Sequence, residues 1–216
     1  MKVLIVASQK GGAGKTTLAA HLAVAAENLL PKKVVILDGD PQGSLSAWWN
    51  SREQEYPALA SSTLDELPEK IEQLREAGFE LVIIDTPPAI TNAITKIVKL
   101  ADLVLIPTRP SPHDLRAVGS TVSIALDENK PFIFVVTQAK SNAKLTTQAM
   151  AALSEHGMVS STIIHDRVEY ASSMINGETV VEINKKGRST EEINQLLNLV
   201  LERMNVITKK RNKKAI

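Results

Sequence analysis

The chain has 216 residues, of which 44% are apolar and 23% are charged, and its formal net charge is +1. This length and composition predict one globular domain with a sizeable core, and the small net charge excludes a uniformly basic fold. The absence of cysteine excludes disulfides, zinc–thiolate sites and iron–sulfur clusters, and it favours a cytoplasmic protein.

Apolar runs and helical patterns alternate along the chain. Strands are expected at residues 2–8, 33–38, 80–86, 102–107, 131–138 and 158–164, and helices at residues 15–30, 64–77, 91–100, 114–127, 143–156 and 189–205. This alternation predicts an α/β fold, with a mostly parallel twisted sheet and helices on both faces. We expect one domain over residues 1–206 and a basic tail at 207–216. We expect neither a signal peptide nor a membrane span.

A glycine-rich segment, SQKGGAGKTT at residues 8–17, joins the first expected strand to the first expected helix. Gly14-Lys15-Thr16 fits the end of the phosphate-loop pattern, although Gln9 stands where the first glycine is expected. A strand, a glycine turn and a helix N-terminus direct backbone amides and the helix dipole at an anion. Lys15 should reach the β- and γ-phosphates, and the Thr16 hydroxyl should bind Mg²⁺. A glycine-rich turn that binds nothing is the alternative.

The expected nucleotide-binding loop consists of Lys10, Gly11, Gly12, Ala13, Gly14, Lys15, Thr16 and Thr17. Its three glycines should let the backbone approach phosphate closely and adopt positive φ angles.

Lys10 is a second lysine, placed ahead of the glycines, so its ammonium need not point into the same phosphate pocket. A charge there can act on a nucleotide held by a facing subunit, in the manner of an arginine finger. A solvated loop lysine is the alternative. KGGAGKTT resembles the deviant Walker A signature of the ParA/MinD family of P-loop ATPases, in which this first lysine acts across a nucleotide sandwich dimer. The resemblance implies an ATPase that homodimerises on ATP, with Lys10 and Lys15 both catalytic.

Two acids follow the second expected strand in LDGDPQGS, residues 37–44. Asp38 and Asp40 can both approach a magnesium-bound phosphate, and one can orient the attacking water or accept its proton. The alternative is an Asp-Pro turn that caps a helix starting near Ser44. The segment matches the DxDPQ switch I of the same family. That match implies that Asp40 positions the water, while Asp38 supports the order of the metal and the water.

Asp85 ends the apolar run in LVIIDTPP, residues 81–88, which is the Walker B arrangement. A carboxylate at such a strand end holds Mg²⁺, often through its water shell. Thr86-Pro87-Pro88 should stop the strand and stiffen the segment that senses the γ-phosphate.

The segment DLVLIPTRPSPHDL, residues 102–115, carries prolines at 107, 110 and 112, which should fix φ and keep the loop after the expected strand from continuing as strand or helix. It resembles the corresponding part of small ParF-like plasmid ParA proteins, whose proline-rich loop lies near the nucleotide. This implies that Pro107 is close to the nucleotide. The same resemblance, which covers the chain up to about residue 206, implies that Thr137 and Gln138 contact adenine.

Basic residues gather near the C-terminal end, where six of them and no acidic residue follow from Arg203 onward. Such clusters are typical of salt-sensitive contacts with a DNA backbone, and a solvated tail is the alternative. The candidate DNA-binding residues are Lys185, Lys186, Arg188, Lys209, Lys210 and Arg211, and the resemblance adds Arg167.

The resemblance implies a plasmid or chromosome partition ATPase that is cytoplasmic and nucleoid-associated. It would use ATP, ADP and Mg²⁺, self-associate as a dimer and in higher-order assemblies, bind non-specific DNA and be released by a ParB-type centromere-binding protein. One alternative is a MinD-like division regulator, for which the amphipathic segment 191–206 would bind a membrane. We instead expect that segment to pack on the sheet, with no membrane partner. Another alternative is a polymerising scaffold with negligible turnover.

Overall fold

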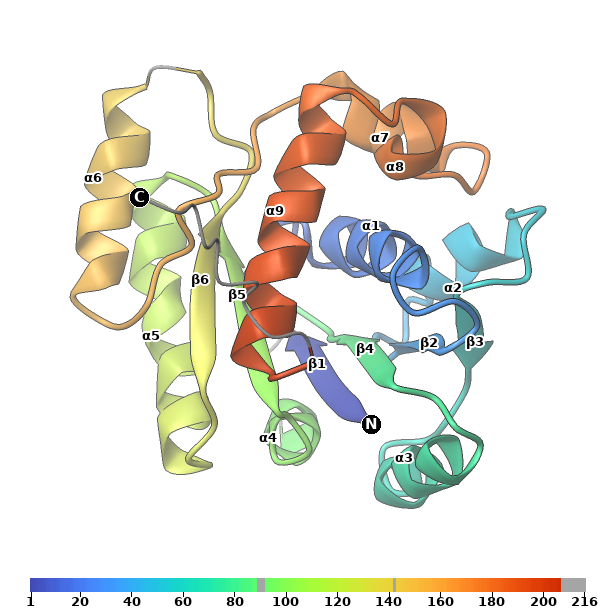
Figure 1. Ribbon diagram of the computed structural model, residues 1–216. Helices are drawn as coiled ribbons and strands as arrows, with labels where there is room; N and C mark the ends of the chain where they lie inside the picture. Colours follow the sequence, from blue (N-terminus) through green and yellow to red (C-terminus); the bar gives the residue numbers. More distant parts are fainter. Residues whose placement is uncertain (89–91, 142, 207–216) are drawn as a thin grey trace, which may run out of the picture.

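The structure is a computed structural model, which describes residues 1–88, 92–141 and 143–206, with the backbone alone at residue 92. In this part of the chain, six strands form one twisted sheet in the order β3-β2-β4-β1-β5-β6, and all pairs are parallel (Figure 1). The strands are β1 (Lys2–Val6), β2 (Val34–Asp38), β3 (Ala58–Ala60), β4 (Leu81–Asp85), β5 (Leu103–Thr108) and β6 (Phe132–Val136). The predicted α/β fold class is confirmed.

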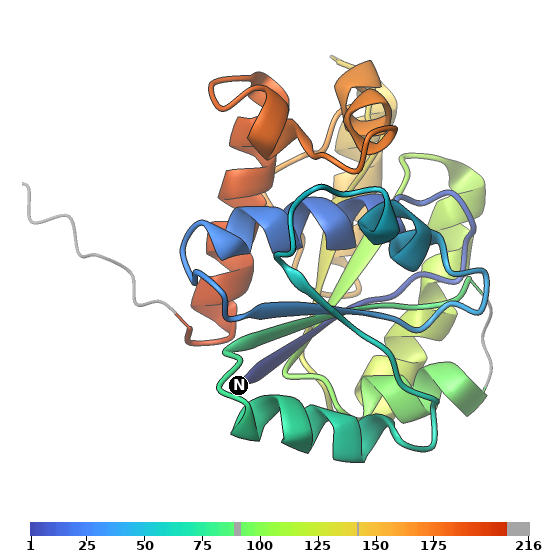
Figure 2. The same cartoon turned by 90° about the vertical axis from the view of Figure 1, so that its right-hand side faces the viewer.

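Helices cover both faces of the sheet, which Figure 2 shows between two layers. One layer contains α1 (Lys15–Glu27), α2 (Ser44–Asn50), α7 (Val168–Met174), α8 (Val180–Ile183) and α9 (Arg188–Arg203). The other contains α3 (Leu67–Glu76), α4 (Asn92–Val98), α5 (Pro112–Asp127) and α6 (Lys144–Ser154).

The central strand β1 shows why the strands are apolar on both sides. Leu4 and Val6 pack against the layer that contains α1, whereas Val3 and Ile5 pack against the layer that contains α3. Successive side chains of a strand point to opposite faces, so a sheet that is covered twice needs apolar residues throughout. The carboxyl ends of these buried strands carry the polar residues of the site.

The segment 158–164 was predicted as a strand, and that prediction is wrong. It follows β6 but touches it only at separate points, with an isolated bridge between Phe134 and Val159 and a later hydrogen bond from the amide of Ile164 to the Val136 carbonyl. Between these points the Ser160 hydroxyl accepts a hydrogen bond from the amide of Thr162 at 3.0 Å. Such local side-chain bonds to the backbone compete with a sheet ladder.

The strand predicted at 102–107 and the helix predicted at 114–127 both form, and two of the prolines of 102–115 lie within these elements. Pro107 lies within β5, where the pairing with β1 has already ended at Leu105, so its missing amide costs no hydrogen bond of the ladder on that side. Pro112 is the first residue of α5, and Ser111 caps that helix by accepting from the amide of Asp114. The first helical turn tolerates proline, because its amide has no partner within the helix.

The predicted amphipathic segment near the C-terminal end forms α9, and its apolar face is buried. Leu196, Leu197, Val200 and Leu201 belong to the same core cluster as α1 and the sheet. This packing confirms the expected use of the apolar face. Within the described ranges, none of the helices combines the length and apolar character needed to cross a bilayer.

Candidate nucleotide-binding site

The glycine-rich loop runs from the end of β1 into the first turn of α1. Gly12 and Gly14 have φ angles of 73° and 90°, and Gly14 directly precedes the helix. Residues with a Cβ rarely adopt these angles, which accounts for glycine at both positions. The positive φ expected for Gly11 is not found, and in this loop the left-handed backbone is confined to Gly12 and Gly14. The first turn of α1 carries no acidic residue, so its N-terminus is open to an anion.

The two lysines of the loop lie in different environments. Lys15 is buried, and its ammonium donates to the backbone oxygen of Lys10 at 3.4 Å. Burial lowers the pKa of Lys15, whereas Asp85 and Asp40 favour its charged form. The Lys10 side chain is exposed, and its ammonium makes no ion pair with any residue that the structure describes. One lysine therefore faces the inside of the loop, and the other faces solvent.

A hydrogen bond joins the glycine-rich loop segment to the end of β4. The Thr16 hydroxyl donates to Oδ2 of Asp85 at 2.5 Å, and Asp85 is only 1% exposed. Within the described chain the other oxygen, Oδ1, is buried without a hydrogen-bond partner. Burial raises the pKa of Asp85 to about 7, against the Thr16 hydrogen bond and the Lys15 charge.

These residues fit a magnesium ion. A buried carboxylate oxygen without a partner, next to a hydroxyl, offers the hard oxygen ligands that Mg²⁺ prefers. The described residues contain no cluster of three or more acidic or histidine side chains arranged for a metal. Mg²⁺ in phosphate sites needs only one or two carboxylates, since phosphates and waters supply the rest. Thr16 and Asp85 are the residues that would hold it.

The two acids of 37–44 lie beside Asp85, because Asp38 and Asp85 are register partners at the ends of β2 and β4. Asp38 accepts hydrogen bonds from the amide of Asp40 at 3.1 Å and from the amide of Ser46, in the first turn of α2, at 2.8 Å. Asp38 therefore does anchor the following helix, as the capping alternative proposed. Its support of metal and water stays a prediction.

Asp40 is less engaged, since among the described residues its carboxylate accepts one hydrogen bond, from the amide of Gln42 to Oδ1 at 3.0 Å. Its carboxylate is half-buried, and its role in positioning a water stays a prediction. Gly39, between the two acids, is a residue that sequence reasoning missed. Its amide donates to the Asp85 carbonyl at 2.9 Å, and a Cβ there would lie 2.7 Å from that oxygen. The signal in the sequence is a glycine between two acids at a strand end.

A cavity of about 180 Å³ adjoins the phosphate loop at the end of β6. Thr137 and Gln138, the predicted adenine contacts, both line it, yet both side chains also bind the loop. The Thr137 hydroxyl donates to the Ala13 carbonyl at 2.9 Å, and the Gln138 amide donates to the Gly12 carbonyl at 2.6 Å. Contact with adenine stays a prediction. Pro107 is buried within β5 and does not line this cavity.

The other residues that line this cavity come from the start of α1, from the segment that leads into α7 and from α7 itself. They are Gly14, Thr17, Leu18, Ile164, His165, Asp166, Arg167, Tyr170 and Ala171. The cavity thus opens directly beside the N-terminus of α1, where a phosphate would lie.

The comparisons with known proteins agree with this geometry. A family model described as CbiA, the CobQ/CobB/MinD/ParA nucleotide binding domain, matches residues 4–180. The chain belongs to this family.

Two relatives and one solved structure illustrate the breadth of the ParA/MinD family. The chain is 31% identical over 210 residues to "Maintenance of carboxysome distribution protein A" of Halothiobacillus neapolitanus, covering 92% of this chain and 95% of the relative. It is 30% identical over 174 residues to "Protein ParA" of Rhizobium radiobacter, covering 78% of this chain and 75% of the relative. A structure of Cyanothece McdA in complex with ATP superposes with a TM-score of 0.72 at 21% identity, covering 95% and 96% of the two chains.

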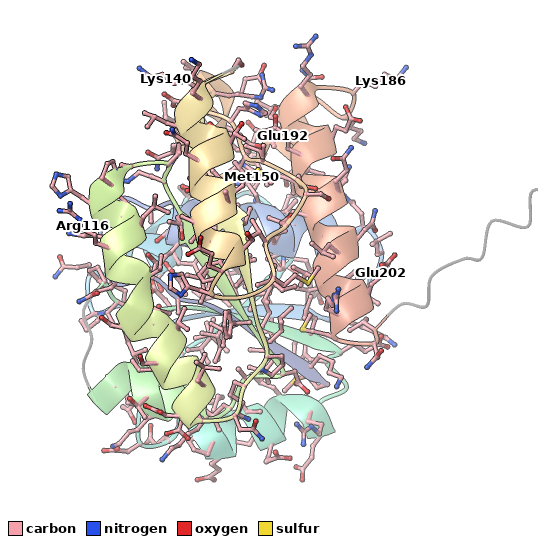
Figure 3. All side chains as sticks on the ribbon, turned by 90° about the vertical axis from the view of Figure 1, so that its left-hand side faces the viewer. Arg116, Lys140, Met150, Lys186, Glu192 and Glu202 are labelled. Carbon is pink, nitrogen blue, oxygen red and sulfur yellow. The ribbon has the colours of Figure 1, made fainter. Side chains whose placement is uncertain are left out.

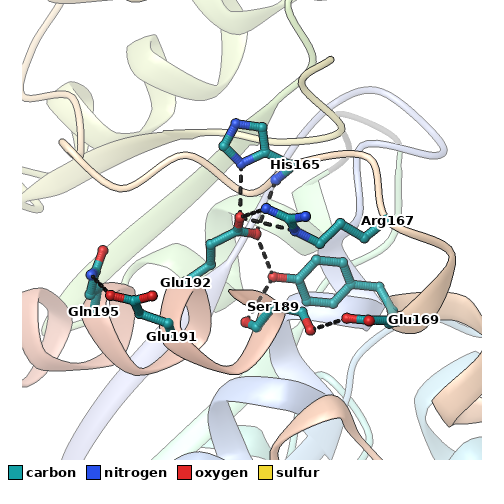
Figure 4. Close-up of polar contacts among 8 residues, drawn as sticks. His165, Arg167, Glu169, Ser189, Glu191, Glu192 and Gln195 are labelled. Carbon is teal, nitrogen blue, oxygen red and sulfur yellow. Dashed lines mark hydrogen bonds and ion pairs between the residues drawn. The ribbon is translucent and has the colours of Figure 1, made fainter. Parts of the chain in front are cut away.

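The ParA/MinD domain of this chain holds its predicted DNA-binding arginine in an internal network, shown in Figure 4. Arg167 donates to one oxygen of Glu192 from Nε at 3.1 Å and from Nη2 at 2.6 Å. His165 and the hydroxyl of Tyr170 also bind this carboxylate, each within 2.9 Å. Burial opposes the charge of Glu192, but these hydrogen bonds hold its pKa below its usual value. Arg167 thus faces Glu192, and its contact with DNA stays a prediction.

The remaining predicted DNA-binding residues of this ParA/MinD chain divide into two groups. Lys185, Lys186 and Arg188 are exposed at the turn from α8 into α9. Figure 3 shows Lys186 at the same end of the molecule as Lys140, which is also exposed. The others, Lys209, Lys210 and Arg211, lie outside the described residues.

Proposed function

We propose that this ParA/MinD family ATPase is a Mg²⁺-dependent switch that dimerises on ATP, binds non-specific DNA as the dimer and leaves DNA when a partner stimulates hydrolysis. The observation that carries this proposal is the contrast between Lys15, which is buried within the phosphate loop, and Lys10, which is exposed on the same loop.

The exposed position of Lys10 supports action across a dimer. Lys15 already provides the loop with a buried cation, and Lys10 has no acidic partner among the described residues. A point charge on the outside of a phosphate site can offset the negative charge of a γ-phosphoryl group on a facing protomer. Two such lysines, one from each protomer, would make triphosphate the ligand that joins the copies.

The acids at the strand ends supply the hydrolytic chemistry. The free oxygen of Asp40 would orient the attacking water, while Asp38 fixes the 38–40 turn through two backbone amides. Lys15 and the loop amides would hold the phosphates in place. Mg²⁺, held by Thr16 and Asp85, would neutralise charge on the phosphates when bound. Catalysis of phosphoryl transfer rests mainly on such positioning and charge stabilisation.

The exposed basic residues suit a DNA surface that doubles on dimerisation. Lys185, Lys186 and Arg188 lie on one exposed turn, and phosphate contacts of this kind are indifferent to sequence. The relative named "Protein ParA" supports plasmid or chromosome DNA as the cargo, with a ParB-type protein as the partner that stimulates hydrolysis. The protein would then be associated with the nucleoid.

A second cargo is favoured by the relative named for carboxysome distribution, which matches 92% of this chain at 31% identity. In that case the same ATP and DNA cycle would distribute a protein body, and only the adaptor protein would differ. A MinD-like membrane role has less support, because the apolar face of α9 is already packed in the core. A scaffold without turnover stays an alternative, and Asp40→Ala tests it. If hydrolysis drives release, this variant should remain on DNA as a trapped dimer, whereas an unchanged dissociation rate would favour the scaffold.

The decisive experiment is size-exclusion chromatography with light scattering, with ADP and with a non-hydrolysable ATP analogue. Wild type should have the 23.4 kDa mass of one chain with ADP and about twice that mass with the analogue. Lys10→Ala should stay monomeric in both, and Lys70→Ala, a control lysine on α3, should behave as wild type. A wild-type protein that binds the analogue and stays monomeric would overturn the sandwich dimer.

A further inference from the structure

An arginine that no motif singled out lies against the phosphate loop. Arg109 follows β5, the neighbour of β1 in the sheet. A Cβ placed on Gly12 would lie 3.5 Å from Nη1 of Arg109, and no other heavy atom outside the immediate chain would be as near. The guanidinium therefore lies beside the glycine turn of the loop, next to the backbone that would bind phosphate.

The guanidinium is held at one nitrogen only. Its Nε donates to Oδ1 of Asp114 at 2.9 Å, and the side chain of Asp114 is 5% exposed. Asp114 is itself fixed, because it accepts a hydrogen bond from the Ser111 hydroxyl and lies in the first turn of α5. This anchoring orients Arg109 without using the two terminal nitrogens.

Neither terminal nitrogen of Arg109 donates a hydrogen bond to any residue that the structure describes. The side chain is 36% exposed, so these nitrogens remain open to an incoming ligand. A planar fork of N–H donors matches the oxygens of a phosphate group. Lys15 is buried within the same loop, so Arg109 would add a second cation beside the same anion site.

We infer that Arg109 is a phosphate-binding residue, whose guanidinium contacts the phosphate chain of the nucleotide seated in the loop of its own protomer. Asp114 is the positioning residue that aims it. Arg109 takes this role only if nucleotide binds the loop, as proposed above, but the role does not require dimerisation.

The test is the affinity for Mg²⁺–ADP, measured by titration calorimetry, because ADP should leave the protein monomeric. Arg109→Gln keeps a hydrogen-bond donor but loses the charge, and Arg109→Lys keeps the charge. We expect Arg109→Gln to weaken ADP binding roughly 10-fold or more, and Arg109→Lys to recover part of the loss, since hydrogen bonds between charged groups are the strong ones. Arg116→Gln, at an exposed arginine on the same helix α5, should bind as wild type. Thermal melting without nucleotide checks that all variants fold.

Three outcomes would overturn the assignment. ADP affinity unchanged in Arg109→Gln would remove the phosphate contact. If Arg109→Gln bound ADP more tightly than Arg109→Lys, the charge would not matter, and Arg109 would only brace the loop. A defect confined to the ATP-driven dimer would assign the guanidinium to the neighbouring protomer. If wild type bound no nucleotide, the proposed function would fail as well. If wild type bound ADP but did not dimerise, only the dimer proposal would fail. The ADP affinities of the Arg109 variants would still decide the role of Arg109.

Discussion

Thr16 and Asp85, which are 69 positions apart in the sequence, share a hydrogen bond of 2.5 Å at the carboxyl edge of the sheet. Asp85 is also the register partner of Val6, the last residue of β1, and of Asp38, the last residue of β2. One buried carboxylate therefore lies where the phosphate loop, the Asp38–Asp40 turn and β4 converge.

This convergence predicts a metal-dependent effect of Thr16. Thr16→Ala removes the hydroxyl that binds Asp85. We expect the ratio of ADP affinity with Mg²⁺ to ADP affinity with chelator to fall roughly 10-fold in this variant. Thr16→Ser retains the hydroxyl and should keep a ratio close to that of wild type. Calorimetry with Mg²⁺ and with chelator gives the ratio for each variant. The same ratio in Thr16→Ala as in wild type would contradict the assignment of a metal ligand to this hydroxyl.

Gly39 should be intolerant of even one added carbon. The Cβ of Gly39→Ala would lie 2.7 Å from the backbone oxygen of Asp85, which cannot move without disturbing β4. We expect a loss of about 1–3 kcal/mol in the free energy of unfolding, as for other overpacked sites. The matched control is Gly119→Ala in α5, where nothing lies within 4 Å of the added Cβ. It should gain about 0.5–1 kcal/mol, because alanine is the better helix former.

Urea unfolding of both alanine variants measures these changes. Equal stabilities for the two would mean that the 38–40 turn can shift away from β4, and the close approach would then not explain the glycine.

His21 should make the protein less stable as the pH falls below neutrality. Its ring is fully buried, with Nδ1 at 2.8 Å from the Thr17 carbonyl and Nε2 at 3.4 Å from the Ser173 hydroxyl. Tyr170 of α7 packs edge-on against it, and Glu182 of α8 is the acid that favours its charge. Burial nevertheless lowers the pKa of His21 to about 4, from its ordinary value of 6.5.

The direction of this pH dependence follows from the charge of His21 in the folded and unfolded states. Above pH 6.5 His21 is neutral in both, so its contribution is level. As the pH falls from 6.5 towards 4, the unfolded chain binds a proton that the folded chain refuses, and stability falls by about 3 kcal/mol in total. Urea unfolding across this range should show a flatter profile for His21→Gln than for wild type. His113→Gln, at an exposed position, is the control and should keep the wild-type slope. Parallel profiles for His21→Gln and wild type would refute the prediction.

The exposed turn between α8 and α9 should carry part of the DNA affinity. Replacing Lys185, Lys186 and Arg188 with alanine should weaken binding of the ATP-bound dimer to random-sequence DNA roughly 10-fold. The slope of log affinity against log salt should also become shallower, by about 1 for each lost contact. The control replaces Arg75 on α3, Lys96 on α4 and Lys99 directly after α4, which are exposed at the opposite end of the molecule (Figure 1). Fluorescence anisotropy over a salt series measures both quantities. Equal losses of affinity in the two triple variants would contradict a DNA contact at the turn between α8 and α9.

Sequence reasoning succeeded where one residue type had one clear physical use. The apolar strand at β1, the glycines before Lys15 and the acid that ends β4 each follow from chemistry that few other arrangements satisfy. It failed for 158–164, whose apolar ends resemble a strand although Ser160 diverts the backbone in between. β3 is too short for a pattern, with three residues that include two alanines.

The missed site residues have a different cause. Gly39 and Arg109 matter only because of atoms that lie far away in the sequence, the carbonyl of Asp85 and the backbone of Gly12. No local pattern specifies such a neighbour. Only the order of strands brings the segment after β5 next to the loop after β1.

The hydrogen bonds from Thr137 and Gln138 to the carbonyls of Ala13 and Gly12 connect the lining of the cavity beside β6 to the glycine-rich loop. A ring that displaced either side chain would also rotate the peptide planes that face the phosphates. A nucleobase that fits this cavity poorly should therefore also disturb the backbone geometry of the phosphate loop.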